Sequence, residues 1–127
     1  MPIEPIVATQ ALPALGLLDA AAVARLQELD PSGSAGLLPR VLATYTQSLQ
    51  RLLEQLRTAR READVHVQHR VVHTLKSSSA SVGALKLSAL CADIEHKLRD
   101  GLTVGLGAQL DALTVEGERI LAALHQS

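Results

Sequence analysis

One apolar stripe constrains the fold of this chain more than any other feature of its sequence. Over residues 37–56, apolar side chains recur every three or four positions, which places them on one side of a helix for several turns. The stripe consists of Leu37, Leu38, Val41, Leu42, Tyr45, Leu49, Leu52, Leu53 and Leu56. The pattern predicts a long helix from about Ser34 or Ala35 to Arg60. Pro39 falls near its first turn, where a missing amide donor costs little.

The composition favours helices throughout. The chain has 127 residues, of which 47% are hydrophobic, yet Tyr45 is the one aromatic residue. Its core must therefore be built from leucine, valine, isoleucine and alanine. Leucine and alanine are strong helix formers and β-branched residues do not dominate, so an all-α domain is favoured over a β-sandwich. The length fits a single domain.

The same helical spacing predicts three more long helices. The first runs from near Glu62 or Asp64 to Ser81 and ends at Gly83, because glycine accepts the left-handed conformation that closes a helix. Its buried face consists of Val65, Val72, Leu75, Ser79 and Val82. The next helix ends at Gly101 and contains Leu85, Leu87, Leu90, Cys91, Ile94 and Leu98. The last, residues 106–125, has a weak point at Gly117 and uses Leu106, Leu110, Leu113, Ile120, Leu121 and Leu124.

A shorter helix precedes these four. Asp19 can cap it, the Asp30–Ser34 run ends it, and its apolar side consists of Val23, Leu26 and Leu29. Residues 1–17 contain three prolines without a helical period, and we interpret them as an extension or linker. Residues 18–127 are then the domain. The predicted fold is an all-α antiparallel four-helix bundle with a short additional N-terminal helix.

Charge and cysteine content limit the possible partners. Twelve basic and 13 acidic residues give a net charge of -1, which argues against nucleic acid and favours a protein partner. Arg57, Arg60 and Arg61 are interpreted as a solvated helix end. The single cysteine, Cys91, cannot form a disulfide within one chain and fits a reducing, cytoplasmic setting. Ala11–Val23 is too short to span a bilayer, so no direct membrane insertion is expected.

One face of the helix that ends near Ser81 carries a histidine followed by small side chains. His73, Lys76, Ser77 and Ala80 stand at i, i+3, i+4 and i+7 and therefore share that face. An ordinary histidine is largely neutral at pH 7 and has a lone pair that can act as a nucleophile. The small side chains that follow would let a bulky partner bring its backbone close. The pattern indicates a nucleophile with a docking surface.

The segment from His73 to Ala84, HTLKSSSASVGA, resembles the signature of histidine phosphotransfer (HPt) domains, roughly H-x-L-K-G-S-S-x-x-x-G. The resemblance extends from about Leu18 to the C-terminus, and an acidic residue at Glu95 also fits it. It implies a bundle that accepts a phosphoryl group on His73 and exchanges it with the aspartate of a response-regulator receiver domain. A sensor or hybrid histidine kinase is a further implied partner, and a larger sensor kinase would tether the domain to a membrane. We expect a monomer.

The neighbours of His73 receive roles on this interpretation. Lys76 is expected to disfavour protonation of His73 before transfer and to stabilise the phosphoryl group afterwards. The expected docking residues are His69, Arg70, Ser77 and Ala80. Ser78 is a candidate for supporting hydrogen bonds, although a hydroxyl bonded back to the preceding turn is the simpler interpretation.

The chain is expected to need no cofactor of its own. It has no carboxylate cluster near His73 for Mg²⁺, so the metal is expected in the partner's aspartate pocket. It has no glycine-rich nucleotide-binding segment, so it should lack autonomous kinase activity.

Alternatives remain open at this level. Ser77 stands where the family has glycine and could crowd an incoming receiver domain, which leaves room for an adaptor that is never phosphorylated. His66, His69 and His73 at i, i+3 and i+7 could hold a metal, although Lys76 on the same face would repel a cation. Cys91 lies at core spacing, so we do not expect it to be a nucleophile.

Overall fold

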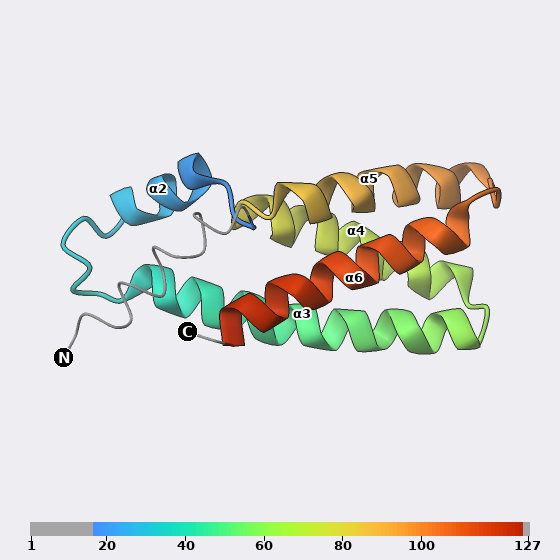
Figure 1. The fold of residues 1–127 in the computed structure, drawn as a ribbon, viewed down its shortest axis with the longest axis horizontal. Helices are drawn as coiled ribbons and strands as arrows, with labels where there is room; N and C mark the ends of the chain where they lie inside the picture. Colours follow the sequence, from blue (N-terminus) through green and yellow to red (C-terminus); the bar gives the residue numbers. More distant parts are fainter. Residues whose placement is uncertain (1–16, 126–127) are drawn as a thin grey trace.

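The described part of the chain, residues 17–125 of the computed structural model, consists of five helices and their connections. They are α2 (Ala20–Glu28), α3 (Leu37–Arg61), α4 (Val65–Ser81), α5 (Leu85–Asp100) and α6 (Leu106–His125) (Figure 1). The last four run antiparallel in turn, each packs against the next, and α6 returns against α3. The prediction of an all-α four-helix bundle with a short additional N-terminal helix is confirmed.

The core lies between the four long helices and is almost entirely aliphatic. Its largest fully buried apolar side chains are Leu49, Leu53, Leu56, Val71, Val72, Leu75, Leu87, Cys91, Ile94, Leu113 and Ile120. The predicted stripe on α3 is confirmed, because all its members except Leu37 are buried or packed against this cluster. Within residues 17–125 no helix is both long and apolar enough to cross a membrane. The proline-bearing residues 1–16 of the predicted extension lie outside the described residues.

Side-chain caps and a left-handed glycine determine where the helices begin. The carboxylate of Asp19 accepts from the Ala22 N–H at 3.1 Å and caps α2, as predicted. The carboxylate of Asp64 caps α4 in the same way. The start of α3 was placed two or three residues too early, because Gly36 adopts a left-handed conformation with a φ of 64°. The loop before it is held by Asp30, whose carboxylate accepts from the Leu37 N–H at 3.1 Å.

Three residues assigned to buried faces are exposed instead. Leu29, Val65 and Leu85 have exposed fractions of 74%, 55% and 50%. Each lies at a helix end: Leu29 caps the C-terminus of α2, and the other two are the first residues of α4 and α5. Periodicity describes a helix face but not where the neighbouring helix ends, so these assignments were wrong.

Gly83 ends α4 as predicted and also anchors α2. Its φ is 83°, and its carbonyl accepts from the Asp19 N–H at 2.7 Å. A Cβ at this position would lie 2.8 Å from the Ala22 Cβ and 2.9 Å from the Asp19 nitrogen. The start of α2 therefore rests directly on the turn between α4 and α5.

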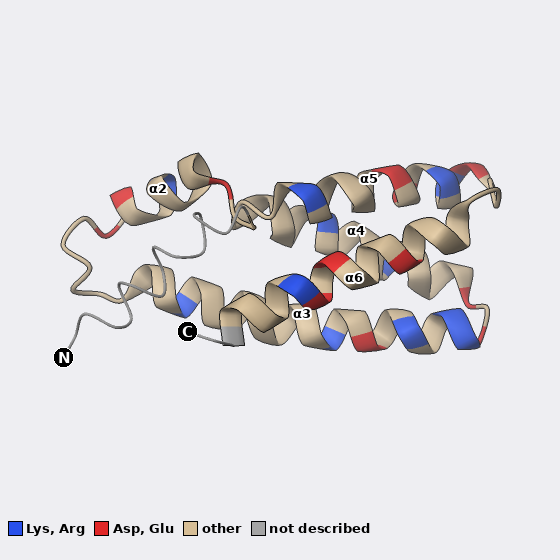
Figure 2. Ribbon diagram, in the orientation of Figure 1, with Lys and Arg blue, Asp and Glu red and all other residues tan. Residues whose placement is uncertain are grey.

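The arginines at the end of α3 pair with α6. Arg57 binds Glu118, and Arg60 binds Asp111 at 2.8 Å, so ion pairs join α3 to α6. Figure 2 marks the acidic and basic positions along the ribbons of these helices. These two arginines therefore form ion pairs between helices in addition to ending a helix, which the sequence did not predict. Gly117, predicted as a weak point of α6, is buried where a Cβ would lie 2.9 Å from the Leu53 Cδ1.

Candidate functional site

Helix α4 has one buried and one exposed face, and His73 lies on the exposed face. The predicted residues Val72, Leu75 and Ser79 are fully buried. The His73 side chain is 61% exposed, and Ser77 and Ala80 are exposed on the same face. Ser77 and Ala80 are small side chains, and most of the imidazole faces solvent.

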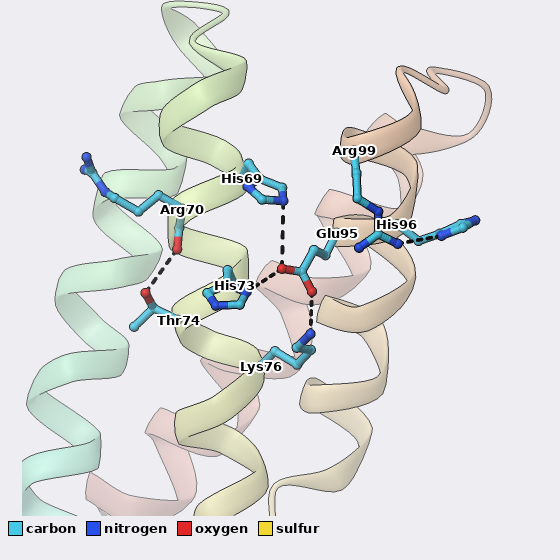
Figure 3. Close-up of polar contacts among 8 residues, drawn as sticks. All are labelled: His69, Arg70, His73, Thr74, Lys76, Glu95, His96 and Arg99. Atoms are coloured by element: carbon cyan, nitrogen blue, oxygen red, sulfur yellow. Dashed lines mark hydrogen bonds and ion pairs between the residues drawn. The ribbon is translucent and has the colours of Figure 1, made fainter.

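A buried carboxylate from α5 holds the imidazole of His73. Glu95 is 6% exposed, and its Oε2 contacts the His73 Nδ1 (Figure 3). Its Oε1 accepts from the Lys76 Nζ. One carboxylate thus bridges two side chains that stand one turn apart on α4.

The charge of Glu95 determines which nitrogen of His73 carries the proton. The Lys76 ammonium, and to a smaller extent His73, lowers the pKa of Glu95 below its ordinary value of 4.5, against the opposing effect of burial. An ionised carboxylate can only accept hydrogen bonds, so Nδ1 of His73 must be the donor. In a neutral imidazole the lone pair then resides on Nε2. Nε2 is therefore the nitrogen whose lone pair is free.

The role predicted for Lys76 changes with this geometry. We expected its ammonium to act directly on His73, but in the structure it binds the carboxylate that lies between the two side chains. The side chain of Lys76 is 36% exposed. Lys76 therefore keeps Glu95 ionised, and through Glu95 it influences His73.

His69 also faces this carboxylate. Its Nε2 lies 3.8 Å from the Glu95 Oε2. Its ring lies nearly parallel to that of His73, with an interplanar angle of 19° and a centroid separation of 6.4 Å. His69 is therefore part of the group around Glu95, whereas the sequence predicted only a docking residue.

The remaining predicted site residues lie around this group without joining it. In Figure 3 the Arg70 side chain points away from His73, and it lines a groove between α3 and α4 with Arg51 and Glu54. The groove has a volume of about 400 Å³. The Ser78 hydroxyl donates to the Leu75 carbonyl at 3.4 Å, which agrees with a hydroxyl bonded back to its own helix. His66 is exposed on α4.

Glu95 is the site residue whose importance sequence reasoning underestimated. From the sequence it is an acidic residue in the expected helix, without an assigned role. The signal was available: Glu95 stands four residues after Cys91 and next to Ile94, at positions that belong to the buried stripe of α5. A carboxylate on a buried stripe needs partners of opposite charge or hydrogen-bond donors. Lys76 and His73 are those partners.

Cys91 and Tyr45 lie beneath the site, inside the bundle. Burial raises the pKa of the Cys91 thiol to about 12, so this side chain remains a neutral thiol. The Tyr45 hydroxyl hydrogen-bonds to the Ser79 hydroxyl at 2.9 Å, and burial raises its pKa to about 12 as well. These residues join α3 to the back of α4. Among the residues that the structure describes, no group of three or more histidine, cysteine or acidic side chains is arranged to hold a metal ion.

The fold and the site define a class: a four-helix bundle that presents one exposed histidine, held through Nδ1 by a buried carboxylate. The model of the Hpt domain family matches residues 40–126, and the chain belongs to this family. Hpt domains are phosphotransfer relays of two-component systems and interact with receiver or kinase domains. The matched range includes His73, Lys76 and Glu95.

Solved structures show the same fold. Histidine-containing phosphotransfer protein B (HptB) from Pseudomonas aeruginosa PAO1 is 24% identical, with a TM-score of 0.75 over 87% of this chain and 92% of that chain. A rice protein assigned as a histidine-containing phosphotransfer protein is 21% identical, with a TM-score of 0.75 over 98% and 90% of the two chains. The search of curated proteins gave no match.

Proposed function

We propose that this chain accepts a phosphoryl group on Nε2 of His73 and exchanges it with the phosphorylated aspartate of a response-regulator receiver domain. One observation carries the proposal: the ionised Glu95 accepts a hydrogen bond from the Nδ1–H of His73, while most of the exposed imidazole faces solvent. This arrangement holds the ring in one orientation and directs its lone pair outward.

The electrons balance without a general base. The Nε2 lone pair of His73 attacks the phosphorus of the aspartyl phosphate, and the bond between phosphorus and the aspartate oxygen breaks. The bonding pair returns to the partner's carboxylate. The phosphorylated ring still carries its Nδ1 proton and is therefore formally cationic, so the negative charge of Glu95 stabilises it. Reversal of the same steps returns the phosphoryl group to aspartate.

The partner must supply the rest of the catalysis. Phosphoryl transfer depends on positioning and on charge stabilisation around the phosphorus, usually with Mg²⁺. In this proposal the receiver domain holds the Mg²⁺ beside its aspartate. The chain contributes an oriented nucleophile and a surface on which the receiver can dock.

The proposed docking surface is the exposed part of α4 around His73, formed by Ser77, Ala80 and Ser81. Side chains on a helix lean toward its N-terminus, so the Ser77 side chain leans toward the turn that carries His73. Serine adds one hydroxymethyl group where the family has glycine. We expect Ser77→Gly to leave acceptance intact or to speed it, whereas Ser77→Arg should block docking.

Labelling tests the proposal. The protein is incubated with a phosphorylated receiver domain, and acid-labile, base-stable phosphate is measured on the wild type and on His73→Gln. His66→Gln is the matched control, because His66 is exposed on the same helix. We expect label on the wild type and on His66→Gln but none on His73→Gln. Label that persists on His73→Gln would assign the acceptor to another residue and overturn the proposal.

A further inference from the structure

The further inference concerns His69, whose imidazole ring lies beside that of His73 on α4. The phosphoryl-accepting role proposed for His73 does not by itself give His69 a function. His69 nevertheless stacks near His73, and its Nε2 faces the same Glu95 oxygen that His73 contacts. Its side chain is 41% exposed, so protons can reach it from solvent.

The direction of the side chains places these groups in sequence along α4. A helical side chain leans toward the N-terminus of its helix, so the His73 ring lies over the turn that carries His69. A phosphoryl group on His73 would therefore be near the His69 ring. Ser77 lies on the C-terminal side of His73, so the His73 ring leans away from it.

The charged groups around His69 come from two helices. On α4 they are His66, Arg70, His73 and Lys76. On α5 they are Glu95, whose Oε2 lies 3.8 Å from the His69 Nε2, the next residue His96, and Arg99 one turn beyond Glu95. His96 and Arg99 hydrogen-bond to each other at 3.0 Å. Arg51 and Glu54 of α3 line a groove together with Arg70. In Figure 3 the Arg70 side chain points away from His73.

We propose that His69 is a proton-linked positioning residue of the acceptor site, which binds a proton when His73 is phosphorylated. This inference rests on the proposed function of His73. A phosphoryl group carries about two negative charges, and the cationic His73 ring cancels one of them. About one negative charge is therefore added to a site where Lys76 already neutralises Glu95. The added charge favours the protonated form of the neighbouring imidazole. Protonated His69 then forms an ion pair with Glu95 and offsets the charge of the phosphoryl group.

Linkage gives the functional consequence. If phosphorylation of His73 increases the proton affinity of His69, then protonation of His69 must favour the phosphorylated state by the same factor. Through His69, acidification shifts the phosphoryl group from the receiver domain toward this chain. The separate protonation of unphosphorylated His73 acts in the opposite direction, so the effect of His69 appears as a difference between the wild type and His69→Gln.

NMR titration of the histidine rings tests proton binding without a partner protein. The wild type is phosphorylated chemically with phosphoramidate, and the His69 ring is titrated before and after. We expect its midpoint to move to higher pH by about half a unit, because exposed charges several ångströms apart interact weakly in water. The His66 ring, further from His73 along the helix, is the control and should move less.

The outcomes separate the two proposals. A His69 midpoint that is unchanged or falls, in protein that carries phosphate on His73, overturns the role of His69 and leaves the proposed function intact. Failure of His73 to take up phosphate from phosphoramidate and from a receiver domain contradicts the proposed function instead.

Phosphoryl partition with a receiver domain gives a second readout. The equilibrium constant for transfer to this chain is measured from about pH 8 to about pH 6 for the wild type, His69→Gln and His66→Gln. A midpoint shift of about half a pH unit corresponds to about a threefold change in the equilibrium constant. The equilibrium constant of the wild type, divided by that of His69→Gln, should therefore rise up to about threefold on acidification. A ratio that stays constant, or a His66→Gln variant with the same loss, contradicts the inference.

Discussion

At the scale of single residues, the proposed chemistry depends on one buried carboxylate. Glu95 accepts from the His73 Nδ1 and from the Lys76 Nζ, and its negative charge determines that the free nitrogen of His73 is Nε2. A surface histidine without this contact could rotate and change its protonated nitrogen. The carboxylate is therefore what distinguishes His73 from His66 on the same helix.

Replacing Glu95 tests this role. Glu95→Ala removes the group that orients the ring, so transfer to His73 should slow by about tenfold to a hundredfold. Glu95→Gln keeps an amide oxygen that can accept from Nδ1–H and should recover part of the rate. Rapid-quench measurement of labelling checks both, with circular dichroism as a control for the fold. A Glu95→Ala rate within about twofold of the wild type would show that the ring needs no such support.

The same carboxylate predicts how stability depends on pH. The pKa of Glu95 is lowered in the folded state, first of all by the Lys76 ammonium, from its ordinary value of 4.5. The ion pair therefore stabilises the fold above that value, and this contribution is lost as the pH falls through the lower folded pKa. Urea unfolding at a series of pH values should show that the advantage of the wild type over Glu95→Gln shrinks below about pH 4.5. An advantage that stays constant down to about pH 3 would mean that Glu95 does not titrate in this way.

At the scale of helices, two glycines join elements together. Gly83→Ala combines a left-handed backbone with a Cβ that would meet the Asp19 backbone and Ala22, so it should destabilise the fold by at least about 2 kcal/mol. Gly33→Ala is the matched control, because Gly33 has a φ of 73° but no atom near its Cβ position. It should lose only about 1 kcal/mol, the strain alone. Equal losses in chemical denaturation would show that the contact with α2 is unimportant.

Gly117 tests the packing of α6 on α3. Helix propensity alone predicts that Gly117→Ala stabilises by about 1 kcal/mol. The added Cβ would lie 2.9 Å from Leu53, which is 1% exposed, so overpacking of about 1 to 3 kcal/mol should outweigh that gain. Gly107→Ala on the same helix meets nothing closer than the Arg60 side chain at 4.0 Å and should be neutral or slightly stabilising. A Gly117→Ala protein that is more stable than the wild type would contradict this account of the packing.

Helix identity could be predicted from the sequence, whereas contacts between helices could not. The stripe on α3, the cap at Asp19 and the stop at Gly83 are local signals, and each was confirmed. Leu85 was misassigned, because burial at a helix end depends on where the neighbouring helix stops.

In the candidate site, too, features within one helix could be predicted, whereas contacts between helices could not. The sequence placed His73 and Lys76 on one face, since both lie on one helix. It did not reveal that Glu95 comes between them, because that contact joins α4 to α5 across 19 to 22 positions of the sequence. A carboxylate at a core position of α5 was the available clue.

At the scale of the whole molecule, the bundle supports the histidine that we propose as the nucleophile. The four long helices bury an aliphatic core. Ion pairs join α3 to α6, and the site lies on α4 and α5 (Figures 1 and 3). Nothing in this arrangement requires the bundle to change shape when phosphate arrives. On this account the protein contributes orientation, and its partner contributes the metal and the phosphoryl donor.

The position of the phosphoryl group on the His73 ring tests this account most directly. Two-dimensional NMR of the ¹⁵N-labelled, phosphorylated protein identifies the nitrogen that is bonded to phosphorus. The account predicts a single phosphoramidate on Nε2, with Nδ1 still protonated against Glu95. Phosphate on Nδ1 would contradict it, because that nitrogen would have to give up its hydrogen bond to Glu95 before it could attack.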